Sequence, residues 1–496
     1  MKRSKFYIRV KRLLAIFSVL ITSYSCEKDL NQVVYDKLST STFFKTADDA
    51  KAAVTASYRG MASFWSNNRG TQRLDALATD EGIAVRPNVE GYTELNELNL
   101  FEDFTRGIIF NAYFNLMPVI TEITINMDKI SAITMDENLK ARLIAELTGL
   151  RAIYSYQILN LYGAMTIPID PKIAADPAAE FVPRPTTAAM VTQIESDYKA
   201  AAAVLPPRFT GNDYGRISKA ACLTGLMKLY MHEKRWSDAV TVGNQIKGLG
   251  YSLMPDYDGN FTLKNKGGNN EIILAVPARP DLNGNLWLQT ALPETYRDPS
   301  GQSTQASASD VFRMPWKTFD KFDASDLRAK RLLAKYPTVG GVIYDVRAHP
   351  EYPKNIGAVV MKYGLDPAAI GALHGIDMVV CRYADVLLLL AEAINETQGP
   401  TAEAYSLINE VRKRAGLNDL IAGLTKDQFR NKLMDERLFE LWCEGVRRED
   451  LIRWGTFIKR AIDDGSVYAK PEFVLYPLPR QVISESGGII KQNPGY

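Results

Sequence analysis

Cysteine and histidine are scarce in this chain of 496 residues, which contains four cysteines and three histidines. Three thiols remain apart from Cys26, so at most one internal disulfide can form, and disulfides cannot build the fold. His232, His349 and His374 do not stand at metal-ligand spacing from one another or from a cysteine, which argues against a zinc centre. The sequence also lacks a P-loop and a Gly-x-Gly-x-x-Gly turn after a strand. We therefore expect no metal ion and no cofactor.

Excess charge of either sign is also missing. The chain has 59 basic and 57 acidic residues, a net charge of +2. Six of the basic residues and none of the acids fall in residues 1–25, so the remainder carries 53 against 57 and a net charge of −4. A mildly acidic body has little bulk attraction for nucleic acid, and we expect no nucleic-acid partner.

The N-terminus has the pattern of an export signal. Its basic start precedes a short apolar run, residues 13–21, that is too short to span a bilayer. Ser25 is small, as cleavage requires, and Cys26 follows at once, although Ser23 stands where leucine is usual. Residues 1–25 thus resemble a bacterial lipoprotein signal, with Cys26 as the lipidation site anchoring the protein in a membrane. The alternative is ordinary secretion with Cys26 as an incidental thiol.

Helical periodicity dominates the rest of the chain. A polar tether, residues 26–41, leads to an N-terminal helical region, 42–250, whose first helix is capped at Thr46. Further helices are predicted over 108–131, 138–162 and about 186–203. Around 220–248 and 387–416, two helices separated by a break form units of roughly 34 residues, the tetratricopeptide period. We expect no later stretch to be long and apolar enough to cross a membrane.

Residues 251–380 are different, since they are rich in glycine, proline, asparagine and aspartate and hold only short strand-like pieces. We interpret them as a loop-rich insert, with residues 381–496 forming C-terminal helix pairs and a closing segment. The predicted fold class is mostly α, with tetratricopeptide-like helix pairs and an irregular region where a ligand would bind.

Several segments in order resemble the SusD/RagB family of surface nutrient-binding lipoproteins of Bacteroidetes. They are residues 43–50 (FFKTADDA), 151–156 (RAIYSY), 382–388 (RYADVLL), 409–416 (NEVRKRAG), 450–455 (DLIRWG) and 492–496 (QNPGY). The resemblance covers nearly the whole mature chain, with Cys443 departing from the bulky apolar or aromatic residue expected there. It implies a surface-exposed, lipid-anchored protein of the outer membrane. Such a protein would capture an oligosaccharide, or less often a peptide, and pass it to a TonB-dependent (SusC-like) transporter, without catalysis.

Aromatic and polar residues in two loops are candidates for sugar contact, because sugars stack on exposed rings and bond to amides, acids and arginine. The candidates are Trp65, Asn68, Arg73, Asp75 and Tyr92 after the first helix, and Trp287, Tyr296 and Trp316 in the insert. The alternative for each aromatic residue is packing that holds its loop in place.

Two other patterns have sharper and plainer interpretations. Glu436, Glu440 and Glu444 lie four apart on one helical face and could form the acid–base pair of a glycoside hydrolase. Arginines crowd the same segment, and we favour a structural ion-pair network. Residues 256–260 (DYDGN) faintly resemble a calcium loop, and we favour a plain turn. The alternative functions are therefore a secreted helical glycoside hydrolase and a peptide-binding or scaffolding repeat protein.

Overall fold

Long helices build the first half of the molecule. The computed structural model describes residues 43–66, 70–86, 91–101, 103–299, 301, 309–338, 340–350 and 354–496. The helices of this half are α2 (Ala47–Ser57), α3 (Arg59–Met61), α4 (Thr71–Leu77), α5 (Tyr92–Asn96), α6 (Asp103–Ser131), α7 (Glu137–Tyr162), α8 (Pro171–Ala175) and α9 (Thr187–Val204). The capping box predicted at Thr46 is confirmed, since its hydroxyl accepts from the Asp49 N–H and the Asp49 carboxylate accepts from the Thr46 N–H.

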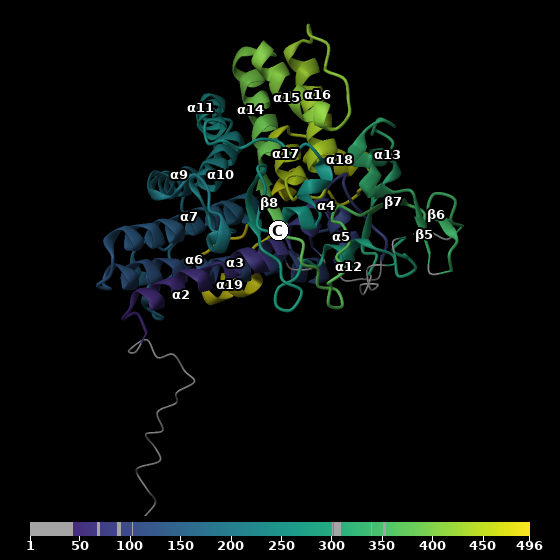
Figure 1. The fold of residues 1–496 in the computed structure, drawn as a ribbon. Coiled ribbons are helices and arrows are strands. Elements are labelled where there is room, and N and C mark those ends of the chain that lie inside the picture. Colours follow the sequence, from purple (N-terminus) through teal and green to yellow (C-terminus); the bar gives the residue numbers. More distant parts are fainter. Residues whose placement is uncertain are drawn as a thin grey trace, which may run out of the picture.

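Helix pairs extend this layer in two further parts of the chain (Figure 1). They are α10 (Lys219–His232) with α11 (Trp236–Lys247) and α14 (Tyr383–Gln398) with α15 (Ala402–Arg414), followed by α16 (Lys426–Leu441), α17 (Arg447–Arg453), α18 (Phe457–Asp463) and α19 (Arg480–Glu485). Packing runs from α7 to α9, α10, α11 and α14 in turn. Small residues permit the close crossings: a Cβ on Gly225 would lie 2.4 Å from the Tyr198 ring. The predicted mostly α fold with tetratricopeptide-like pairs is confirmed.

Short strands and turns make up the segment between α11 and α14, and one strand from between α4 and α5 joins its largest sheet. The strand pairs among the described residues are antiparallel. A four-stranded sheet has the order β1 (Ile83–Ala84), β3 (Phe312–Pro315), β7 (Gly357–Val360), β4 (Leu332–Leu333). Strands β2 (Ile272–Val276) and β8 (Met378–Arg382) pair with each other, as do β5 (Lys335–Pro337) and β6 (Ile343–Asp345). Two short helices, α12 (Trp287–Ala291) and α13 (Trp316–Phe319), complete the segment, which lies beside the helical layer in Figure 1.

Helix α6 corrects one expectation about membrane crossing. Its portion Gly107–Ser131 is long and apolar enough to cross a membrane by length and composition alone. Half of its most apolar window is buried within the protein, and α6 packs along α7 and α2. Core helices of water-soluble proteins meet the same criterion, so this helix is weak evidence for a span.

Candidate functional site

The three glutamates that are spaced four residues apart belong to a buried ion-pair network. Glu436 and Glu440 lie on α16, and Glu444 follows it; all three are at most 5% exposed. The Arg328 guanidinium donates to Glu436 at 2.7 Å and to Glu440 at 3.0 Å. Arg382 bonds both Glu440 and Glu444. The structural network favoured from the sequence is therefore confirmed.

Its partners are not the arginines that neighbour these glutamates in sequence. Arg437 pairs with Asp385 and Asp450, Arg447 with Asp80, and Arg453 with Glu392. The network instead joins five cations to five carboxylates from separate segments, so its charges balance. The cations are Arg328, Lys362, Arg382, Arg412 and Arg414, and the carboxylates are Glu271, Asp326, Glu436, Glu440 and Glu444.

This setting is unsuited to proton transfer at Glu440. Burial alone would raise the pKa of the Glu440 carboxyl, but Arg414, Arg382 and Arg328 together hold that pKa far below its usual range. A general acid must carry a proton near neutral pH, and this carboxylate stays ionised and out of reach of solvent. Glu440 is a structural anion. The Asp256 segment is likewise a plain turn, in which Asp256 accepts from the Asp258 N–H and pairs with Lys264.

Three of the predicted ligand residues near α4 and α5 are buried. The Arg73 guanidinium donates to the Tyr92 hydroxyl at 2.6 Å and to the Thr290 hydroxyl, so it ties α4 to α5 and to the insert. Asp75 accepts from the backbone N–H groups of Arg447 at 3.1 Å and Arg448 at 2.9 Å, at the N-terminus of α17. Burial raises the pKa of the Asp75 carboxyl to about 7. Through these contacts, Arg73, Tyr92 and Asp75 hold α4, α5, the insert and α17 together.

The predicted aromatic platforms divide into buried and accessible rings. Trp65, Trp287 and Tyr296 are 4–6% exposed, and the Trp287 indole donates to the Val360 carbonyl at 2.9 Å. This geometry favours packing for these three. Trp316 is partly exposed. Asn68 and Cys26 lie outside the described residues, and contact of any of these residues with a ligand stays a prediction.

A set of stacked rings around strands β5 and β6 was missed by the sequence analysis. The Tyr344 ring stacks on Tyr336 at a centroid distance of 4.9 Å and on His349 at 4.8 Å. The Arg347 guanidinium lies 4.1 Å from the centre of the Trp316 ring. Trp316, Tyr344, Arg347 and His349 all keep exposed surface, and we call these four residues the hairpin surface. The sequence does contain a signal for this hairpin. Gly340 and Gly341 stand between two short runs that each contain a tyrosine, a pattern that predicts a β-hairpin.

Asn355 joins the two halves of the hairpin surface. Its carbonyl accepts from the Trp316 indole at 2.6 Å, and its side-chain amide donates to the His349 carbonyl at 2.9 Å. Aromatic faces beside an arginine and an amide are the chemistry that stacks on sugar rings and bonds their hydroxyls. Strands β5 and β6 lie at the edge of the molecule in Figure 1. The hairpin surface is therefore the best candidate for ligand contact.

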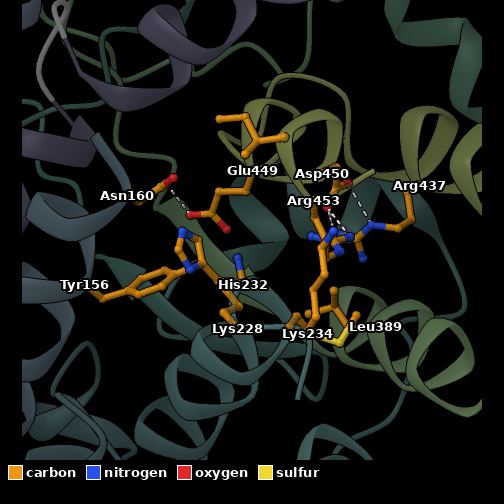
Figure 2. Close-up of a pocket in the computed structure, with 12 residues that line it drawn as sticks. Tyr156, Asn160, Lys228, His232, Lys234, Leu389, Arg437, Glu449, Asp450 and Arg453 are labelled. Atoms are coloured by element: carbon orange, nitrogen blue, oxygen red, sulfur yellow. Dashed lines mark hydrogen bonds and ion pairs between the residues drawn. The ribbon is translucent and has the colours of Figure 1, made fainter. Parts of the chain in front are cut away.

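A separate cavity lies inside the helical layer, between α7, α10, α14 and α17 (Figure 2). Its volume is about 170 Å³, and its lining includes Tyr156, Asn160, Lys228, His232 and Glu449. Within the described chain, no group of three or more histidine, cysteine, aspartate or glutamate side chains is arranged to hold a metal ion. The cavity is thus polar without being a metal centre of that kind.

The fold is that of a helical repeat protein, with a layer of helix pairs and an irregular segment of short strands beside it. Two family models match the chain: the SusD family over residues 369–472, and a family described as "Starch-binding associating with outer membrane" over residues 35–231. The chain belongs to the SusD/RagB family. This assignment agrees with the expectation that the protein is not an enzyme.

Relatives match over most of their length. SusD-like protein P25 of Formosa agariphila is 24% identical over 99% of this chain and 100% of its own. The starch-binding protein SusD of Bacteroides thetaiotaomicron is 25% identical over 86% of this chain and 85% of its own. A solved structure titled "Laminarin binding SusD-like protein" has a TM-score of 0.77 and 23% identity, covering 91% of this chain and 100% of that one. The structural likeness shows a shared fold.

Proposed function

We propose that this protein captures an oligosaccharide at the outer membrane and presents it to a partner TonB-dependent transporter. The observation that carries the proposal is family membership together with relatives named for binding starch and laminarin. The hairpin surface supplies the matching chemistry, because its partly exposed rings stand beside Arg347 and Asn355.

Anchoring is part of the same proposal. Cleavage before Cys26 and lipidation of its thiol would hold the body on the membrane through the tether of residues 26–41. A family model described as associating with the outer membrane supports this location. Transporter partnership is supported by the family assignment, and co-purification of a TonB-dependent protein with the tagged chain from native membranes would test it.

Isothermal titration with maltoheptaose and laminarihexaose tests glycan capture. We expect saturable binding of at least one of the two glucans to the purified protein. Tyr344→Ala should weaken that binding about tenfold, equivalent to about 1.4 kcal/mol, because it removes the ring between Tyr336 and His349. Tyr468→Ala is the matched control, since Tyr468 is 40% exposed on the closing segment. Equal affinity in the Tyr344 and Tyr468 variants would contradict the hairpin surface as the site.

A further inference from the structure

The cavity between α7, α10, α14 and α17 presents groups of opposite charge to one another. In Figure 2 the Glu449 carboxylate points towards His232 and Lys228, with Asn160 beside it. The cavity volume, about 170 Å³, exceeds that of an engineered cavity of about 150 Å³ that binds benzene. A molecule of several heavy atoms therefore fits.

Glu449 is the unusual member of this group. The Asn160 side-chain amide donates to it at 2.8 Å. Among the described residues it forms no ion pair within 4.0 Å, whereas its neighbour Asp450 is bound by both Arg437 and Arg453. Burial raises the pKa of the Glu449 carboxyl, and the positive charges of Lys228 and Arg453 offset part of that rise without forming an ion pair with it. An ionised carboxylate in such a place gains most from a cationic partner that enters the cavity.

Lys228 and His232 supply the opposite chemistry on the same wall. The Lys228 ammonium lies 3.1 Å from Asp385, its ion-pair partner among the described residues. An ammonium has three N–H donors, so Lys228 can bond a ligand as well. His232 bonds Glu233 through Nδ1 at 2.8 Å and packs its ring edge-to-face against Tyr156. Both side chains come from the last two turns of α10.

The rest of the lining defines an entrance and an apolar wall. Lys234 is exposed, in the turn between α10 and α11, and therefore marks the mouth of the cavity. Met231, Leu389 and Ile452 contribute apolar surface to the lining. An acceptor for an ammonium, donors for a carboxylate and an apolar wall occur together in one small space.

We propose that this cavity binds a small zwitterion, a free α-amino acid. Its ammonium would bond Glu449, and its carboxylate would bond Lys228 and, when the His232 ring is protonated, the His232 Nε2–H. Its side chain would pack against Met231, Leu389 and Ile452. The site is separate from the hairpin surface and does not depend on glycan capture.

Thermal shift and isothermal titration with the twenty standard L-amino acids test the site. At millimolar concentrations, at least one amino acid should raise the melting temperature, because it binds the folded state alone. For the best binder, the matching amine without the carboxylate and the matching acid without the amine should each bind about tenfold more weakly, since each loses one charge-assisted contact.

Glu449→Gln should weaken the amino acid about tenfold while the Asn160 amide can still donate to the new side chain. Glu180→Gln is the matched control, because Glu180 is exposed and is far from Glu449 in the sequence. It should bind the amino acid with the affinity of the wild type. Glycan binding is measured on the same samples and should be unchanged in both variants.

Three results would overturn the site: no amino acid binds, the amine or the acid binds as well as the amino acid, or Glu449→Gln binds as tightly as the wild type. If Glu449→Gln loses glycan binding as well, the variant is misfolded, and the analogue series on the wild-type protein decides the matter. A wild-type protein that binds an amino acid but no glycan would contradict the proposed function and would support the amino-acid site.

Discussion

Replacing Glu440 by glutamine should lower this protein's free energy of unfolding by a large fraction and leave the hairpin surface unchanged. Glu440 is fully buried and accepts from Arg328, Arg382 and Arg414. Glutamine has nearly the same shape, but it removes one negative charge and turns an N–H donor towards guanidinium donors. The network would then hold five cations against four carboxylates in the protein core.

Breaking a buried charge pair by removing one partner costs about 3–5 kcal/mol. A domain is typically stable by about 5–15 kcal/mol, so the loss would be a large part of the total. Adding Arg414→Met to Glu440→Gln restores four cations against four carboxylates. The double variant should therefore lose less stability than the sum of the losses in the two single variants, by about 1 kcal/mol or more.

Denaturation in urea, followed by circular dichroism, measures these free energies of unfolding. The control is Glu403→Gln, because Glu403 is 48% exposed and pairs with Lys247 at the surface, which should cost less than about 1 kcal/mol. A loss below about 1 kcal/mol for Glu440→Gln would refute the structural role. Release of sugar products by the wild type, abolished in this variant, would instead restore the hydrolase alternative.

Three further predictions concern other parts of the chain. Burial raises the pKa of Asp75 to about 7, so the contribution of Asp75 to stability is complete below about pH 4 and is lost as the pH rises through 7. Urea denaturation should therefore show that the free energy of unfolding falls less steeply between pH 4 and pH 7 in Asp75→Asn than in the wild type. Equal slopes in the two proteins would contradict the raised pKa. Gly225→Ala places a Cβ 2.4 Å from the Tyr198 ring and should cost about 1–3 kcal/mol, seen as a lower melting temperature, whereas Gly248→Ala, whose Cβ would be at 3.4 Å from its neighbour, should change little. Cys26→Ser should abolish incorporation of labelled palmitate and release the protein from membranes, and persistent labelling would exclude Cys26 as the lipidated residue.

Local signals in the sequence predicted the helical layer well. The capping box at Thr46 and the break between α10 and α11 depend on residues within a few positions of each other, which short-range physics determines. The partners of Glu440 were out of reach for the same reason. Arg328 lies 112 residues away and Arg382 lies 58 away, so the fold alone brings these charges together.

The candidate ligand residues show the same limit. Composition identified the aromatic residues of the loops, but it could not reveal that Trp287 would be buried with its indole bonded to Val360, or that Trp316 would keep exposed surface. Whether a loop ring packs inward depends on contacts with distant strands, here β3 and β7. The stacking of Tyr344 between Tyr336 and His349 likewise required the β5–β6 register, in which Tyr336 lies opposite Tyr344.

A crystal structure of the protein with a bound glucan is the most direct test of glycan capture at the hairpin surface. We expect a sugar ring stacked on Tyr344 or Trp316, with its hydroxyl groups bonded to Arg347 or Asn355. A glucan bound only elsewhere on the molecule, or a protein that takes up no glycan at saturating concentration, would contradict it.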